Sequence, residues 1–263
     1  MLRRFSHSYQ SGITRQEHQS NFKHIPNAYG KLVFEIGHVF ARFQPNSNTK
    51  RVVRTFRKNH LRQWDSIVSF NYDVIFEYSL PENLIWIYVG IDGPDRTRPV
   101  KILKPHGSIN WVEDNGNIGA EDDPDLFPDQ PIVVAPTHLK FIGSGRSEEA
   151  DNSETKSTAG YLNQSEQIAD IWRAMEEAMK DAKGFVFVGY SFPSFDLYFS
   201  SVLRSVLATR SSHPFVVIVN PDSMAIRNRI HSRFAIPLDR IRTFSDLQTF
   251  NQVTRKQVIE MFE

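Results

Sequence analysis

Short apolar runs alternate with longer amphipathic stretches along most of the chain. The runs are four to six residues long and end in glycine or polar residues, which is typical of buried strands. Those that predict strands lie at residues 67–70, 84–89, 100–103, 132–135, 185–188 and 215–219, with a short one near Ile241. Apolar residues at helical spacing predict helices over residues 28–42, 50–60, 73–80, 168–182, 195–209, 223–234 and 247–262. Strands that alternate with helices favour an α/β fold with a parallel, doubly wound sheet.

The remaining stretches are polar and predict loops. Residues 1–27 show no clear period, and residues 113–131 are acidic and rich in Asp, Asn, Gly and Pro, which predicts a surface loop. Residues 143–164 have little apolar content and form the best candidate for a mobile segment. We therefore expect an N-terminal loop and helical cap over residues 1–63 and a nucleotide-binding core over residues 64–263.

Composition narrows the class of protein. The chain has 263 residues, of which 40% are hydrophobic, so it can bury a sizeable core. Its formal net charge of +1, without a long run of one sign, does not suggest nucleic acid or membrane as a direct partner. It contains no cysteine, which removes disulfides and cysteine-based zinc sites and fits the reducing environment of a cytoplasmic protein.

Polar residues follow several of the predicted strands at once. In open α/β sheets, ligands bind at the carboxyl ends of the strands, so residues at these ends are candidates for gripping a ribose and a phosphate. The candidates are Asn71, Asp73, His106, Gly107, Ser108, Gly189, Ser191 and Asn220.

Each candidate also has a simpler structural explanation. Asn71 could cap the helix that follows it, Asp73 could be an acid favoured by the helix dipole, and His106 could be structural. The same holds of the turn-forming residues, which suit tight turns or helix caps without any ligand: Gly189, Ser191 and Asn220.

The joint occurrence of these residues carries a family resemblance. The motifs are Ser-Phe-Asn-Tyr-Asp at 69–73, Lys-Pro-His-Gly-Ser-Ile-Asn-Trp at 104–111, Val-Val-Ala-Pro-Thr at 133–137, Val-Gly-Tyr-Ser-Phe-Pro-x-x-Asp at 188–196 and Val-Asn-Pro at 219–221. In this order they resemble the bacterial SIR2-like domains, which are relatives of sirtuins found in antiphage defence proteins, many of which hydrolyse NAD. The resemblance covers about residues 64–222 and implies a Rossmann-like core with a small helical insertion.

The resemblance also implies roles for the candidates. Asn71 and Asp73 would face the nicotinamide ribose, and His106 would be the catalytic histidine. The residues implied to bind the nucleotide are Gly107, Ser108, Gly189, Ser191 and Asn220. Water would then release nicotinamide and ADP-ribose, a reaction in which NAD is the substrate and no metal is required. Besides NAD or ADP-ribose, a second copy of the chain or further domains of a longer chain are the partners to expect.

These residue types suit that chemistry. Cleavage of the nicotinamide–ribose bond builds an oxocarbenium-like centre, which a nearby carboxylate or amide oxygen stabilises electrostatically. A histidine can hold or deprotonate a ribose hydroxyl or a water molecule at neutral pH. Backbone N–H groups at a Gly-Ser turn before a helix suit a phosphate.

The chain departs from the family in one respect. The family's opening strand and its Gly-Ala-Gly-x-Ser turn, which cradles the pyrophosphate, have no match here. We therefore expect the chain to be truncated and to leave a sheet edge unpaired near residues 67–70 or 185–188. The missing turn keeps open a non-catalytic nucleotide-sensing or assembly module, and an unrelated α/β enzyme is a third reading. A sirtuin-type deacylase is disfavoured, because its zinc module needs four cysteines.

Overall fold

The structure of the protein is a computed structural model. It describes residue 39 and residues 45–62, 65–80, 86–92, 100–114, 117–121, 132–133 and 155–263. The helix predicted over residues 28–42 lies outside the described residues except for Val39, as does the loop predicted over residues 1–27. The division of the chain at residue 63 remains a prediction.

Two parallel sheets form the centre of the described fold. The first has the order β1-β3-β2 and the second the order β10-β9-β8, and all neighbouring strands within them run parallel. The strands are β1 (Ser66–Val68), β2 (Trp86–Tyr88), β3 (Val100–Leu103), β8 (Gly184–Val188), β9 (Phe215–Val219) and β10 (Ile241–Phe244). The predicted α/β class with parallel strands is therefore confirmed, and β3 and β9 span the predicted residues.

Two smaller antiparallel pairs extend beyond the first sheet. They are β4 (Gly107–Ser108) with β7 (Ile132–Val133), and β5 (Trp111–Asp114) with β6 (Asn117–Ala120). The prediction of a loop over residues 113–131 is therefore wrong for its first part, which belongs to the hairpin. The residues between β5 and β6 are Asn115-Gly116, a dipeptide typical of two-residue hairpin turns. Ile118 is buried on β6, which supplies the apolar contact that holds the hairpin.

Seven α-helices and one short 3-10 helix, η1 (Leu238–Arg240), pack around these sheets in the described part of the chain. The α-helices are α4 (Ser47–His60), α5 (Ile75–Ser79), α6 (Thr155–Asp181), α7 (Leu197–Ala208), α8 (Ser223–Phe234), α9 (Leu247–Phe250) and α10 (Arg255–Glu260). Two predictions need correction. The segment expected to be mobile is helical from Thr155 onward. The single helix expected over residues 247–262 is two, because Thr254 starts α10 with a capping box to Gln257.

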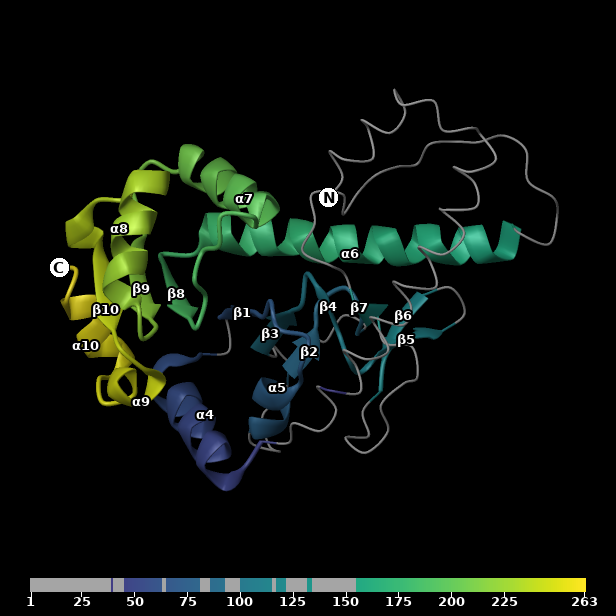
Figure 1. The fold of residues 1–263 in the computed structure, drawn as a ribbon, viewed down its shortest axis with the longest axis horizontal. Coiled ribbons are helices and arrows are strands. Elements are labelled where there is room, and N and C mark those ends of the chain that lie inside the picture. The colour runs from purple at the N-terminus through teal and green to yellow at the C-terminus, as the bar shows by residue number, and fades with distance from the viewer. Residues whose placement is uncertain are drawn as a thin grey trace, which may run out of the picture.

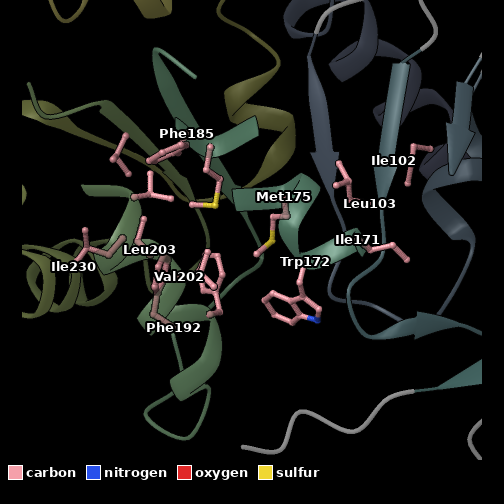
Figure 2. Packing of buried hydrophobic residues seen from close by; sticks show 14 of the residues in the cluster. Ile102, Leu103, Ile171, Trp172, Met175, Phe185, Phe192, Val202, Leu203 and Ile230 are labelled. Atoms are coloured by element: carbon pink, nitrogen blue, oxygen red, sulfur yellow. The ribbon is translucent and has the colours of Figure 1, made fainter. Parts of the chain in front are cut away.

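The long helix α6 joins the two sheets. It runs beside the first sheet and the small antiparallel pairs, and its C-terminal end reaches the start of β8 (Figure 1). It buries Ile171, Trp172 and Met175 in the main core. These side chains lie between Ile102 and Leu103 of the first sheet and the residues of the second sheet and α7 (Figure 2). The indole Nε1 of Trp172 donates to the Pro105 carbonyl at 3.0 Å. The packing of α6 therefore fixes the first sheet relative to the second.

The inner edge of each sheet is unpaired among the described strands. These edges are β1 and β8, which agrees with the edges expected from the sequence. Val186 and Val188 on β8 are 41% and 44% exposed, although their partners on β9, Val217 and Val219, are buried. The helices that cover β9 therefore do not reach over the same face of β8.

Helix α4 is anchored to the C-terminal helices. Its N-cap residue Asn46 accepts from the Thr49 amide at 2.9 Å, and farther along the Nδ2 of Asn59 donates to the Asn251 carbonyl at 2.8 Å. His60 at its end stacks on Phe250 with ring centroids 4.0 Å apart and an interplanar angle of 12°. The buried ring has no hydrogen-bond partner for Nε2 among the described residues.

His60 makes stability depend on pH. Burial lowers its pKa from 6.5 to about 4, so between these values the unfolded chain binds a proton that the folded chain excludes. The free energy of unfolding should therefore fall as the pH drops from 6.5 to 4, by roughly 1–3 kcal/mol from this residue. Urea unfolding of wild type and His60→Phe across this range measures the effect, because the variant should lack that part of the dependence. The exposed His213, changed to Gln, is the matched control. An identical pH dependence of wild type and His60→Phe would contradict the assignment.

Candidate functional site

The turn after β1 and the loop after β3 are joined by hydrogen bonds. Parallel pairing places Val68 opposite Leu103, so the two strands end together. The Tyr72 carbonyl then accepts from the Ser108 hydroxyl at 3.2 Å and from the Ile109 amide at 2.9 Å. The structure thus brings the turn that carries Asn71 and Asp73 against the loop that carries His106, Gly107 and Ser108.

His106 lies in an aromatic setting and is only 4% exposed. Its ring centroid is 5.2 Å from that of Phe70, 5.9 Å from that of Trp172 and 6.3 Å from that of Tyr72. Such packing restricts the orientation of an imidazole, which general acid–base chemistry requires. The same packing also suits a structural histidine.

Gly107 can hardly be any other residue. Its φ of +82° lies in the left-handed region, and a Cβ there would stand 2.1 Å from the Ile132 carbonyl oxygen. The close approach arises because Gly107 pairs with Val133 in the β4–β7 bridge. The glycine that follows His106 therefore fixes the course of this loop.

Of the two helix-start roles considered for Asn71 and Asp73, the structure supports only that of Asp73. Helix α5 has Val74 as its N-cap residue, so the exposed Asn71 does not cap it. Asp73 accepts through Oδ1 from the Ile75 amide at 3.0 Å, so this side chain does help to start the helix.

Gly189 and Asn220 stand at the ends of β8 and β9. The Gly189 amide donates to the Val219 carbonyl at 2.9 Å, which keeps the two strand ends together. Gly189 has a φ of +72°, and a Cβ there would meet nothing within 4 Å. Asn220 accepts through Oδ1 from the Asp222 amide at 2.9 Å, which forms the predicted turn and leaves its Nδ2 as a donor.

A polar network holds the loop between Gly189 and α7. The Tyr190 hydroxyl donates to Oδ2 of buried Asp196 at 2.6 Å, and burial together with this carboxylate raises the pKa of Tyr190. Asp196 also accepts from the Phe199 amide at 3.2 Å as the N-cap residue of α7. The exposed Ser191 is therefore not the helix cap, and its carbonyl accepts from the Arg229 guanidinium instead.

Phe70 connects the two groups of candidates. The centroid of its ring lies 5.2 Å from that of His106 and 5.2 Å from that of Tyr190. It packs edge-on against Phe199 of α7 at 4.9 Å. The aromatic contacts therefore place the strand ends of both sheets at one region of the molecule.

Three residues of this region have contacts that motif reasoning did not assign. Lys104 and Asp196 lie inside the quoted motifs, yet each acts as a buried anchor for a neighbouring loop. Arg229 comes from α8, and nothing in its local sequence indicates a contact with the Ser191 carbonyl. A buried polar residue at a fixed place in a motif is the signal that could have drawn attention to the first two.

Neither a metal cluster nor a membrane span occurs in the part of the chain that the structure describes. No group of three or more His, Cys, Asp or Glu residues is placed there to hold a metal ion. No helix of the described part is both long and apolar enough to cross a bilayer.

Comparison with known families finds one family whose model covers the candidate residues at the strand ends. The family model described as SIR2-like domain matches residues 65–236, which include both parallel-sheet edges and all the candidate residues. The chain belongs to the SIR2-like domain family, and its core is a sirtuin-related NAD-binding fold. A search of curated proteins found no match to the chain.

The two strained glycines of the site should respond differently to alanine. Gly107→Ala adds a clash with the Ile132 carbonyl to an unfavourable φ and should lower the free energy of unfolding by roughly 2–5 kcal/mol. Gly189→Ala meets open space and should lose only the conformational part, about 1–2 kcal/mol. Urea unfolding of both variants measures the difference. Equal losses would show that the β4–β7 contact at Gly107 relaxes without cost.

Proposed function

We propose that the protein is an NAD glycohydrolase that releases nicotinamide and ADP-ribose. The observation that carries the proposal is the set of bonds that hold the Asn71–Asp73 turn against the His106 loop, at the carboxyl ends of β1 and β3. Membership of the SIR2-like domain family supports NAD as the ligand. The ribose next to nicotinamide would lie over this turn.

The reaction needs three contributions from these residues. The bond between the ribose C1′ and nicotinamide breaks with its electron pair leaving on nicotinamide, while water supplies the new C1′ oxygen and loses a proton. Asn71 and Asp73 would position the ribose and the water and stabilise the positive charge that develops at C1′. His106 would hold a ribose hydroxyl or accept the proton, within its aromatic setting.

The phosphates would bind at the ends of β8 and β9. Gly189 exposes its backbone to open space, so a phosphate can approach it closely. Ser191 and the Nδ2 of Asn220 supply polar donors beside it, and Gly107 and Ser108 would bound the ribose side. The Arg229 guanidinium at the Ser191 carbonyl adds positive charge to this region.

The arrangement of the sheets supports a Rossmann-like core. We propose that the two parallel sheets are the halves of one Rossmann-like sheet that is interrupted between β1 and β8. Their ends meet through Phe70 and Tyr190, and the buried residues of α6 belong to the one core that both halves share. The ligand would then lie across the interruption, in the manner of nucleotides at the switch point of an open α/β sheet.

A nucleotide sensor without turnover is the second candidate. The absence of a Gly-rich turn in the sequence favours it, because such a turn would cradle the pyrophosphate. For either candidate, the family resemblance supports a role in antiphage defence in the cytoplasm. The partners would then be a second copy of the chain or further domains of a longer chain.

The catalytic assignment is tested by NAD turnover. Purified protein is incubated with NAD, and nicotinamide release is measured by chromatography, with ADP-ribose binding measured by calorimetry. His106→Ala and Asn71→Ala should each lower turnover at least ~100-fold, the lower range for loss of an acid–base group. The exposed His213→Ala is the control. Near-normal turnover in either site variant would refute the assignment, whereas binding without turnover in wild type would favour the sensor.

Lysine deacylation should not accompany this activity. Sirtuin-type deacylases carry a structural zinc on four cysteines, and this chain has none. An acetyl-lysine peptide incubated with NAD and the protein should keep its acetyl group in a mass-spectrometric assay. Stoichiometric, NAD-dependent loss of the acetyl group would contradict this prediction.

A further inference from the structure

A buried ion pair between Lys104 and Glu77 adjoins the candidate site. The Lys104 ammonium is 3.0 Å from Oε1 of Glu77, and the two side chains are 0% and 1% exposed. The same Oε1 accepts from the Tyr88 hydroxyl at 3.2 Å. Burial and the Glu77 carboxylate raise the pKa of Tyr88, so Tyr88 stays protonated and donates. Glu77 therefore serves as the common acceptor for groups from β2 and from the end of β3.

The ammonium has a second bond that reaches the site. Lys104 Nζ donates to the Asp73 carbonyl at 2.5 Å, and Lys104 is the second residue before His106. One side chain therefore ties the backbone of the Asn71–Asp73 turn to the start of the His106 loop. The bonds from Ser108 and Ile109 reach the carbonyl of Tyr72, the residue next to Asp73 in the same turn.

Stability alone is a poor explanation of this arrangement. Removing two charges from water costs several kcal/mol per ion, and apolar residues of similar size often replace a buried pair without loss. The pair is also incompletely satisfied, because Oε2 of Glu77 has no hydrogen-bond partner among the described residues. A buried carboxylate oxygen in that state is costly. What the pair provides, and an apolar pair would not, is a strong donor aimed at the Asp73 carbonyl.

We propose that Lys104 is a positioning residue, whose ammonium, held in place by Glu77, fixes the Asn71–Asp73 turn against the His106 loop. The proposal deepens the proposed function, since it concerns the same site. In this role Lys104 touches neither the nucleotide nor water. It acts through the Asp73 backbone, and a shift of about 1 Å in such a turn can cost on the order of 100-fold in rate.

The test separates positioning from stability with two variants. Lys104→Met alone leaves Glu77 buried without its cation and should lower the melting temperature. The double variant K104M/E77Q removes both charges and keeps an acceptor for Tyr88, so it should regain most of the melting temperature. Lys101→Met, a substitution of an exposed lysine on β3 three residues before Lys104, is the matched control and should resemble wild type.

Turnover of NAD is the first readout. In the double variant, kcat should stay about 100-fold below wild type while KM changes much less, because the residues at Gly189 and Asn220 are untouched. If the double variant regains wild-type kcat together with its stability, the pair is only structural and the proposal is wrong.

Amide hydrogen exchange is the second readout and does not depend on activity. The Ile75 amide bonds to Asp73 and the Ile109 amide bonds to the Tyr72 carbonyl, so both report on the turn. In the double variant they should exchange at least ~10-fold faster than in wild type, while amides of β9 stay protected. Unchanged exchange at both would overturn the proposal. If wild type fails to hydrolyse NAD, the proposed function fails, and the exchange result still decides the role of Lys104.

Discussion

The fold depends on an aromatic cluster, partly to fully buried, where the two parallel sheets meet. Phe70, two residues after the end of β1, contacts both His106 and Tyr190, and Trp172 of α6 lies beside it. Each sheet has only three described strands and an unpaired inner edge, so hydrogen bonds between the described strands do not join the halves. Their relative position rests on side-chain packing, which in a dense core is sensitive to small changes in volume, and on polar contacts such as the ion pair between Asp65, next to β1, and Arg255 of α10. Because His106 belongs to this cluster, the packing that joins the halves also orients a candidate catalytic group.

Polar anchors complement this packing on either side of the cluster. Lys104 holds the turn after β1, and Asp196 holds the loop after β8 through Tyr190. Both side chains are buried, and each bonds to a loop rather than to a neighbouring strand. Buried polar groups of this kind add little net stability but define one backbone arrangement, because the alternatives leave them unpaired. The candidate site is therefore a set of loops whose positions are fixed by hydrogen bonds from buried side chains.

Local pattern was sufficient for the strands and helices with one clear period. The apolar runs at 100–103 and 215–219 became β3 and β9, and the helix at 223–234 became α8 over the same residues. The prediction failed where a two-residue or one-residue signal lay within a longer stretch of different character. The hairpin dipeptide Asn115-Gly116 lies in an acidic stretch that favours a loop, and the helix-capping Thr254 lies in a stretch that is otherwise helical. The early turns of α6 carry few apolar residues, so the periodicity that revealed its later part was absent.

By itself the sequence determined which residues follow the strands, to within two residues at β1, and with them the candidates Asn71, His106, Gly189 and Asn220. Strand periodicity and turn preferences suffice for this because they act within a few residues. The family followed from the order of these motifs. Only the tertiary structure decided that Phe70 would join the two groups and that Lys104 would anchor Asp73. These contacts join residues that are far apart in the chain, as Phe70 and Tyr190 are, and their partners are chosen by packing and burial rather than by local pattern.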